Sequence, residues 1–189
     1  MTVSSMNTGH QELTTIISQA ERLYSESEVE AAIDKLAVDV TECLKDKNPI
    51  ILCLMTGAVV LLGKLLTKLR FQLEIDYVHA TRYRGDTSGN SIKWLKYPEL
   101  ELAGRNILLV DDILDEGHTI AAVVDECRKR AAIDIYTCVL VDKQLNRHRE
   151  FDRADFTGLT VPDRYVFGYG MDYKGYLRNS PGIFAVKEA

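Results

Sequence analysis

Residues 106–119, with the sequence NILLVDDILDEGHT, decide how this chain folds. Ile107 to Val110 form a continuous branched apolar run of strand length, which is typical of a parallel strand covered by helices on both faces. Asp111 and Asp112 follow where this strand is expected to end, and ligands of open α/β sheets bind outside that edge. The run therefore predicts a central strand with a polar site at its carboxyl end.

The second half of the stretch predicts a phosphate site. Residues 115–119 make a turn at Gly117 and enter a helix expected over 120–130, whose first backbone N–H groups have no partner within the helix. Gly117 lets a ligand approach the backbone closely, and Thr119 offers a hydroxyl. A phosphate held by the turn, with the preceding acids facing hydroxyl groups, describes a phosphorylated ribose.

An ordinary strand–helix junction with a solvated acidic loop is the simpler interpretation of this stretch. Three Asp and one Glu fall within residues 111–116, and acids so crowded repel one another unless a metal or sugar hydroxyls occupy them. This crowding favours the functional interpretation.

Length and composition restrict the class of protein. The 189 residues, 46% of them hydrophobic, suit one domain with one core, and a net charge of -5 argues against nucleic acid or an anionic membrane as the main partner. The apolar run 49–64 is shorter than the roughly 20 residues of a membrane span, and no secretory signal begins the chain. Cysteines without Cys-x-x-Cys spacing indicate buried reduced thiols in a cytoplasmic protein rather than metal ligands: Cys43, Cys53, Cys127 and Cys138.

Periodicity predicts strands that alternate with helices. Apolar spacing predicts a helix over 13–23, and the capping-box pair Ser25 and Glu28 begins a second helix whose apolar stripe runs to Leu44. The remaining predicted elements are a strand over 50–55, a helix over 58–69, a strand over 71–79, a polar loop over 82–97, and strands over 135–141, 156–158, 165–168 and 183–186. This order predicts an α/β fold with a parallel sheet and right-handed crossovers.

Val110 to Thr119 resembles the motif that binds phosphoribosyl pyrophosphate (PRPP) in type I phosphoribosyltransferases. From about residue 10 to the end, the chain is similar to bacterial hypoxanthine-guanine phosphoribosyltransferases. The resemblance implies the type I fold, a parallel central sheet flanked by helices, in one domain of residues 1–189. Its core would span about 45–160, with a small hood formed by the N-terminal helices (about 10–44) and the C-terminal strands (161–189).

The activity implied by the resemblance is purine salvage. N9 of hypoxanthine or guanine displaces pyrophosphate from C1 of PRPP and gives IMP or GMP, with Mg²⁺ as cofactor. The implied protein is a cytoplasmic homodimer or homotetramer with no nucleic-acid or membrane partner. The transition state of this reaction is expected to resemble a ribosyl cation. The site must therefore neutralise charge on the leaving pyrophosphate and transfer a proton at the purine base.

The resemblance assigns roles around the ribose phosphate. Asp115 is expected beside N7 of the purine as the proton-handling residue, although an acid there also suits a helix N-cap. Asp111 and Asp112 are expected to hold the ribose hydroxyls. His118 stands where several relatives have lysine, which turns a fixed cation into a titratable one. The full set for phosphate and ribose is Asp111, Asp112, Asp115, Glu116, Gly117, His118 and Thr119.

On the purine side, Lys143 is expected to follow a strand and to donate to O6. An ammonium cannot accept a hydrogen bond from a 6-amino group, so adenine should be a poor substrate. Tyr165 is expected to stack on the purine, with Phe167 in the core. The full purine set is Lys143, Tyr165, Val166 and Asp172, and Mg²⁺ is assigned to Asp172, Asp111 and Asp112.

The expected pyrophosphate site combines a turn, a loop and a cation. Thr56 stands where several members of the resembled family have lysine. The polar loop from residue 82 is expected to close over the reacting centre and exclude water. The residues assigned here are Met55, Thr56, Gly57, Arg82, Tyr83 and Arg178.

Three other interpretations compete with this one. The first is a PRPP-sensing regulator without catalysis, which the acidic charge and the base-side residues disfavour. The second is a response-regulator receiver, which leaves residues 150–189 unexplained. The third is an adenine- or pyrimidine-specific transferase, which Lys143 and the pair Tyr165-Val166 disfavour. The ranking of hypoxanthine, guanine and xanthine stays open.

Overall fold

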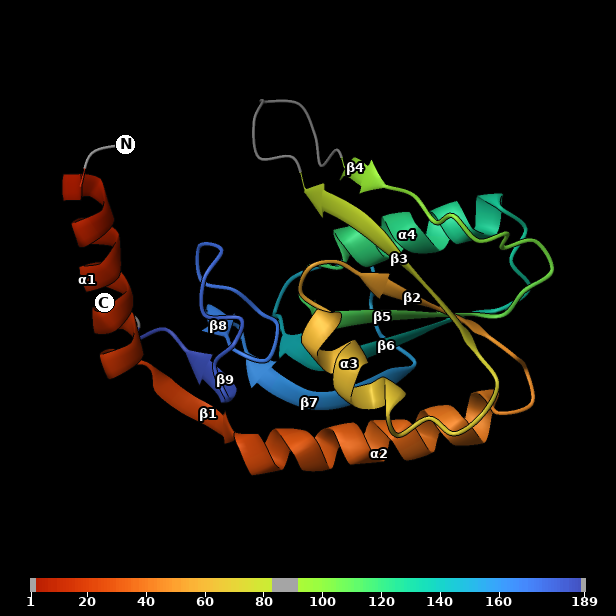
Figure 1. The fold of residues 1–189 in the computed structure, drawn as a ribbon, viewed down its shortest axis with the longest axis horizontal. Coiled ribbons are helices and arrows are strands. Elements are labelled where there is room, and N and C mark those ends of the chain that lie inside the picture. Colours follow the sequence, from red (N-terminus) through yellow and green to blue (C-terminus); the bar gives the residue numbers. More distant parts are fainter. Residues whose placement is uncertain (1–2, 83–91, 188–189) are drawn as a thin grey trace.

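The computed structural model describes residues 3–82 and 92–187, and a six-stranded sheet lies at its centre (Figure 1). The strand order is β4-β3-β2-β5-β6-β7, and every neighbouring pair is parallel except β3 and β4. The predicted α/β fold with a largely parallel sheet is therefore confirmed. The strands are β2 (Ile50–Leu54), β3 (Glu74–Arg82), β4 (Ile92–Lys96), β5 (Ile107–Leu114), β6 (Ile135–Gln144) and β7 (Phe156–Pro162).

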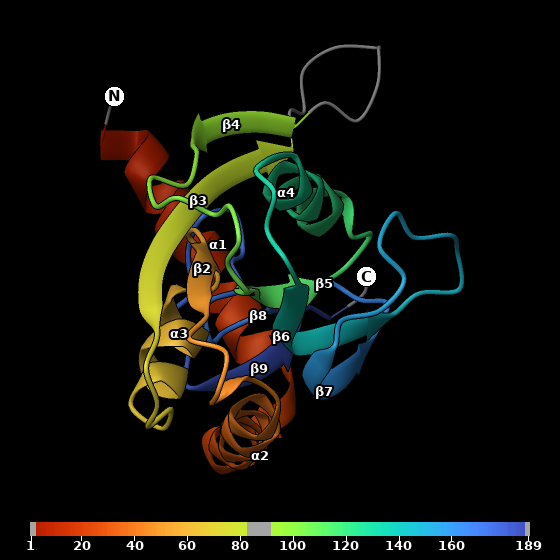
Figure 2. The same cartoon turned by 90° about the vertical axis from the view of Figure 1, so that its right-hand side faces the viewer.

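Helices cover both faces of the sheet (Figure 2). α2 (Glu26–Leu44) and α3 (Val59–Leu66) pack in one apolar cluster with Leu108, and α4 (His118–Lys129) packs in a second with Leu109. Successive strand side chains point to opposite faces, so a strand between two helical layers needs apolar residues at every position. The continuous apolar run 107–110 meets this requirement.

A second, smaller sheet forms the hood. Its antiparallel strands β1 (Glu21–Ser25), β9 (Gly182–Ala185) and β8 (Val166–Phe167) lie together at one end of the molecule, beside α1 (Val3–Gln19) (Figure 1). The predicted helix over 13–23 was wrong in its last part, because residues 21–25 pair with β9 as a strand. The chain enters the hood here as a strand, and α2 packs on the main sheet.

The predicted start of α2 is confirmed in atomic detail. The side chain of Ser25 accepts a hydrogen bond from the Glu28 backbone, and the Glu28 carboxylate accepts one from the Ser25 backbone at 2.8 Å. This reciprocal cap satisfies backbone donors that the first turn leaves open.

Strands β5 and β6 run further than their apolar residues predicted, as do β3 and β7 at their carboxyl ends. β5 continues through Asp111 and Asp112 to Leu114, and β6 continues to Gln144, so Lys143 lies within a strand rather than after it. Asp111 and Leu114 both pair in register with β6, which keeps their backbones in the ladder. The predicted loop 82–97 also contained strand β4, while its residues 83–91 lie outside the described part of the chain.

Asp76 ties β3 to the segment that follows β4. Its buried carboxylate accepts hydrogen bonds from the backbone N–H groups of Glu99 (2.6 Å) and Leu100 (3.0 Å) and from the ammonium of Lys96 (3.1 Å). Burial alone raises the pKa of Asp76, but these donors and the backbone N–H of Tyr77 outweigh burial, so the pKa lies below its ordinary value.

We predict that Asp76→Asn lowers the free energy of unfolding by about 1–3 kcal/mol at neutral pH, because a buried charged acceptor is lost. A depressed folded-state pKa gives stability above the unfolded pKa of about 3.9, and this stability is lost as the pH falls through the folded pKa. Urea denaturation across this range should therefore show the deficit of the variant shrinking at acid pH. Glu42→Gln, at an exposed position of α2, is the control. A deficit independent of pH would contradict the assigned charge.

Candidate active site

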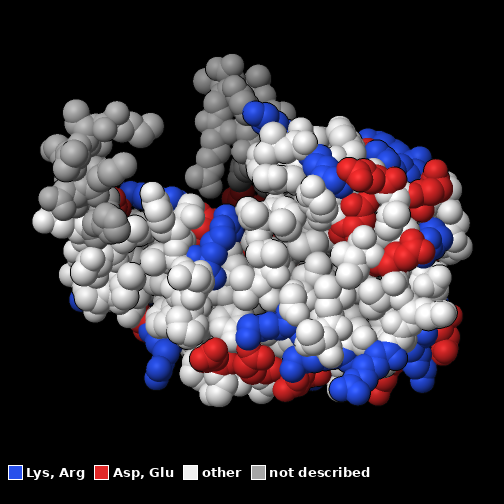
Figure 3. All heavy atoms as spheres, in the orientation of Figure 1, with Lys and Arg blue, Asp and Glu red and all other residues white. Residues whose placement is uncertain are grey.

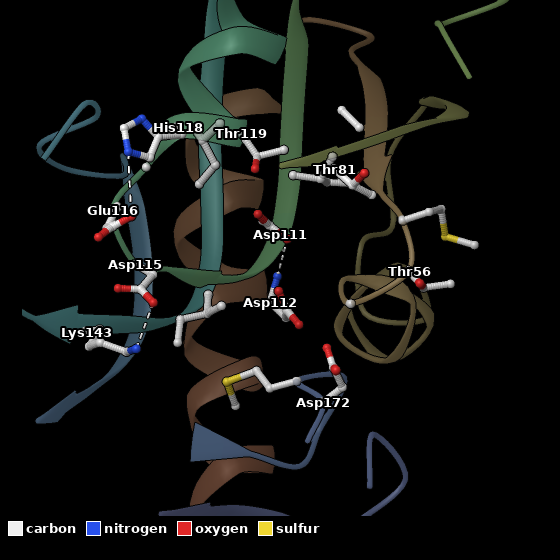
Figure 4. A pocket seen from close by; sticks show the side chains of 18 of the residues that line it. Thr56, Thr81, Asp111, Asp112, Asp115, Glu116, His118, Thr119, Lys143 and Asp172 are labelled. Carbon is white, nitrogen blue, oxygen red and sulfur yellow. Dashed lines mark hydrogen bonds and ion pairs between the residues drawn. The ribbon is translucent and has the colours of Figure 1, made fainter. Parts of the chain in front are cut away.

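A cavity of about 440 Å³ opens at the carboxyl ends of β2, β5 and β6. Figure 4 shows the labelled side chains from β5, from the turn before α4 and from β6 facing this space. The sequence-predicted residues that line it are Met55, Thr56, Gly57, Asp111, Asp112, Asp115, Glu116, Gly117, His118, Thr119, Lys143, Tyr165, Val166, Asp172 and Arg178. Residues far apart in the chain are thus brought to one edge of the sheet, as the position of the acids predicted.

Asp111 and Asp112 are buried at the wall of the cavity. Burial raises the pKa of both carboxyls, and the charge of Asp112 raises that of Asp111 further. Arg178 opposes this effect at Asp112, with its terminal nitrogen 4.0 Å from the carboxylate. Two carboxyls so placed are ready acceptors for hydroxyl groups of a ligand.

The turn before α4 has the conformation that glycine permits. Gly117 is the N-cap residue with φ +81°, and no side chain caps the helix there. Asp115 therefore does not cap α4, which removes the purely structural role considered for it. A Cβ atom on residue 117 would lie 2.7 Å from the Cβ of Phe151. Both this overlap and the positive φ therefore exclude a residue larger than glycine at this position.

Asp115 and Lys143 form an ion pair at one wall of the cavity, where β5 and β6 lie side by side (Figure 4). The Nζ atom of Lys143 donates to Oδ2 of Asp115 at 2.8 Å, and the lysine side chain is only 11% exposed. The other carboxylate oxygen of Asp115, Oδ1, is buried and has no hydrogen-bond partner among the described residues. A buried acceptor without a partner is costly, and a ligand that donates a hydrogen bond would satisfy it.

The opposite wall is built by close approach of two glycines. A Cβ on Gly57 would lie 2.0 Å from Oδ2 of Asp112, and one on Gly170 would lie 2.1 Å from the carbonyl oxygen of Gly57. The peptide bond between Met55 and Thr56 just before this contact is cis. Met55, Thr56 and Gly57 of this turn line the cavity.

Arg178 connects the hood to this wall. Its guanidinium donates to the Gly170 carbonyl at 2.5 Å and to the Asp172 carboxylate at 2.7 Å. The Asp172 carboxylate also accepts from the backbone N–H of Gly175 at 2.7 Å. A cation and an acid are thus held side by side at the rim.

A family model described as "Phosphoribosyl transferase domain" matches residues 19–174. This chain belongs to the phosphoribosyltransferase family. The matched range includes strand β5, the acid pair and the turn at Gly117.

Individual relatives support the same family. A hypoxanthine-guanine-xanthine phosphoribosyltransferase from Tritrichomonas foetus is 34% identical over 177 residues, which cover 93% of this chain and 97% of the relative. A hypoxanthine-guanine phosphoribosyltransferase from Bacillus subtilis is 33% identical, with 88% of this chain and 93% of the relative covered. A solved structure of a hypoxanthine-guanine-xanthine phosphoribosyltransferase superposes with a TM-score of 0.80 at 34% identity, over 89% of this chain and 97% of that one.

The aromatic residues and the start of the polar loop that were predicted for this phosphoribosyltransferase lie in different surroundings. Tyr165 is 51% exposed at the rim and meets Tyr173 edge-on with ring centroids 5.5 Å apart, while Phe167 is buried against Phe184 as predicted. Arg82 is the last residue of β3, and Tyr83 lies outside the described residues.

Sequence reasoning missed part of the cavity lining in β3. His79 and Thr81 both face the cavity, although no motif marks them. Their signal was indirect, because a strand parallel to β2 must bring its carboxyl end to the same edge of the sheet. Ile120 and Met171 were also missed as lining residues.

We predict that Gly57→Ala destabilises the protein by about 1–3 kcal/mol, since the added methyl group overlaps the Asp112 carboxylate. Gly63→Ala is a matched control, because a Cβ at this exposed position of α3 meets no atom within 4 Å. That control should raise stability by about 0.4–1 kcal/mol. Equal urea midpoints for the two variants would contradict the close packing at residue 57.

Proposed function

We propose that this phosphoribosyltransferase transfers the 5-phosphoribosyl group from PRPP to hypoxanthine or guanine, giving IMP or GMP and pyrophosphate in purine salvage. The observation that carries the proposal is the Asp115–Lys143 pair, with a buried carboxylate oxygen left open, next to the glycine turn. The names of the relatives from Tritrichomonas foetus and Bacillus subtilis support the same reaction.

The pair suits the O6/N7 edge of a 6-oxopurine. Lys143 can donate to O6, and the Asp115 carboxylate, whose Oδ1 has no partner among the described residues, can accept a proton or hydrogen bond from N7. The amino group of adenine would instead point a donor at an ammonium, which accepts no hydrogen bond. The pair therefore selects oxopurines and gives Asp115 the proton-handling role.

The phosphoribosyl group would lie between the turn and the acid pair. The first N–H groups of α4 and the hydroxyl of Thr119 would hold the 5′-phosphate. Asp111 and Asp112 would accept from the ribose hydroxyls, and such bonds favour the ionised carboxylates that burial disfavours. The sugar would thus offset the unfavourable burial of the two acids.

The leaving pyrophosphate would lie between Arg178 and the backbone of the turn 55–57. Mg²⁺ fits here, because Asp172, Asp111 and Asp112 offer hard oxygen donors. No group of three or more His, Cys, Asp or Glu side chains in residues 3–82 and 92–187 is placed to hold a metal alone. The ion would therefore take most ligands from substrate and water, and when bound it would neutralise charge on pyrophosphate.

A PRPP-sensing regulator is the weaker alternative, because a sensor has no need of the Asp115–Lys143 pair. We propose a homodimer or homotetramer, supported by exposed apolar side chains on β3 and β4 such as Tyr77 (45%) and Leu95 (54%). We also propose that nucleic acid is not a partner, and the interspersed acidic and basic side chains on the face shown in Figure 3 support this.

A cytoplasmic location is also proposed, supported by the thiols of the chain. Cys53, Cys127 and Cys138 are free and buried as expected, whereas Cys43 is only half-buried. Burial raises the pKa of Cys53 and of Cys138 to about 12, which keeps these thiols protonated and unreactive. None of the helices in the described residues has the length and apolar character to cross a membrane.

The proposal predicts turnover of hypoxanthine and guanine with PRPP and Mg²⁺, and little turnover of adenine, in a spectrophotometric assay of each purine. Asp115→Asn should lower kcat by about 10²–10⁴-fold, the range of general acid–base catalysis. Asp125→Asn is the control, because Asp125 is an exposed acid of α4 paired with Arg128. Preference for adenine or orotate, or full activity of Asp115→Asn, would reject the proposal.

A further inference from the structure

Residues 145–155, which join β6 to β7, pack against the turn at Gly117. The backbone N–H of Glu150 donates to the carbonyl oxygen of Glu116 at 2.9 Å. Phe151 occupies the space that a side chain at residue 117 would need. The phosphate-binding turn is therefore supported from outside by a segment to which neither the motif nor the proposed chemistry gives a role.

Arg147 in this segment bridges two acids. Its Nε atom lies 3.6 Å from a carboxylate oxygen of Glu116, and a terminal guanidinium nitrogen donates to the carboxylate of Asp163. Asp163 lies in the turn between β7 and β8, two residues before Tyr165. One guanidinium thus connects the phosphate-binding turn to the wall that carries Tyr165 and Val166.

An incidental surface ion pair is the simpler explanation. The Arg147 side chain is 50% exposed, and exposed pairs contribute little to stability. The geometry here is more specific, because two different nitrogens of one planar group face two acids, Glu116 in the cavity lining and Asp163 two residues before the lining residue Tyr165. Lysine has a single ammonium and cannot reproduce this two-sided contact.

The charges also matter for the ligand. Glu116 belongs to the turn that would receive a phosphate, and a carboxylate there repels a dianion. Arg147 faces one oxygen of Glu116, and Nε2 of His118 lies 3.6 Å from the other. Figure 4 shows Glu116 and His118 side by side. Arg147 therefore both orients the Glu116 side chain and offsets its charge.

We propose that Arg147 is a positioning residue that fixes the phosphate-binding turn relative to the purine wall through Glu116 and Asp163. The inference rests on the proposed function, because it assumes that the turn receives the phosphate of PRPP. Loss of Arg147 loosens the turn and exposes PRPP to the Glu116 charge, so substrate binding is weakened while the reacting groups Asp115 and Lys143 stay in place.

Steady-state kinetics and calorimetric PRPP binding test this role. Arg147→Gln should raise the KM for PRPP about tenfold, the fold-change of one charge-assisted hydrogen bond, and change kcat by no more than about twofold. Asp163→Asn should raise the KM for PRPP less than Arg147→Gln does, because Arg147 still faces Glu116. The double variant should be no worse than Arg147→Gln alone, since both substitutions break one link. Arg147→Lys should fall between wild type and Arg147→Gln.

Arg153→Gln is the matched control, because Arg153 is an exposed arginine of the same segment outside this cavity. It should leave the KM for PRPP unchanged. Thermal unfolding of each variant checks that the fold persists, and Asp163→Asn tests the link even where Arg147→Gln is unfolded.

Three results would overturn the inference: wild-type PRPP affinity in Arg147→Gln, full rescue by Arg147→Lys, or effects of Arg147→Gln and Asp163→Asn that multiply. Failure of the wild-type protein to bind or use PRPP would instead reject the proposed function itself. The two failures are therefore distinguishable.

Discussion

Burial of two adjacent carboxyls at the end of β5 is the constraint on which the rest of the site depends. Removing Asp111 and Asp112 from water is unfavourable, and burial accordingly raises the pKa of both. Two contacts offset part of this cost. A guanidinium nitrogen of Arg178 lies 4.0 Å from a carboxylate oxygen of Asp112, and the backbone N–H of Asp112 donates to the Asp111 carboxylate at 2.9 Å. A ligand rich in hydroxyl groups would donate further hydrogen bonds to the two carboxyls and so offset more of the cost of their burial.

The same constraint explains the glycines around the acid pair. Gly57 approaches Asp112 so closely that no side chain fits between them, and Gly170 packs on the carbonyl of Gly57. The segment between β8 and β9 contains Gly170 and also carries Asp172 and Arg178. Packing at the glycines therefore sets where the charged side chains at the rim lie. The close contact between the backbones of Gly57 and Gly170 thus helps to position Asp172 and Arg178 at the rim of the cavity.

The sequence predicted those features that depend on local chemistry. The run 107–110 and the turn at Gly117 carry their own signals, a two-sided apolar pattern and a residue that accepts positive φ. Strand β1 was missed because Leu23 also continues the helical spacing of residues 13–20, and only pairing with β9 makes this segment a strand. His79 and Arg147 were missed because their roles come from neighbours distant in the chain, which one sequence does not reveal.

A crystal structure of the protein with IMP would show whether the turn at Gly117 and the acid pair hold a ribose 5′-phosphate. We expect the 5′-phosphate within about 3 Å of the backbone nitrogens at residues 117–119. We also expect the ribose hydroxyls on Asp111 and Asp112, and the purine edge on Lys143. A nucleotide bound with its phosphate at the turn 55–57, or outside this cavity at saturating concentration, would show that the site is assigned wrongly.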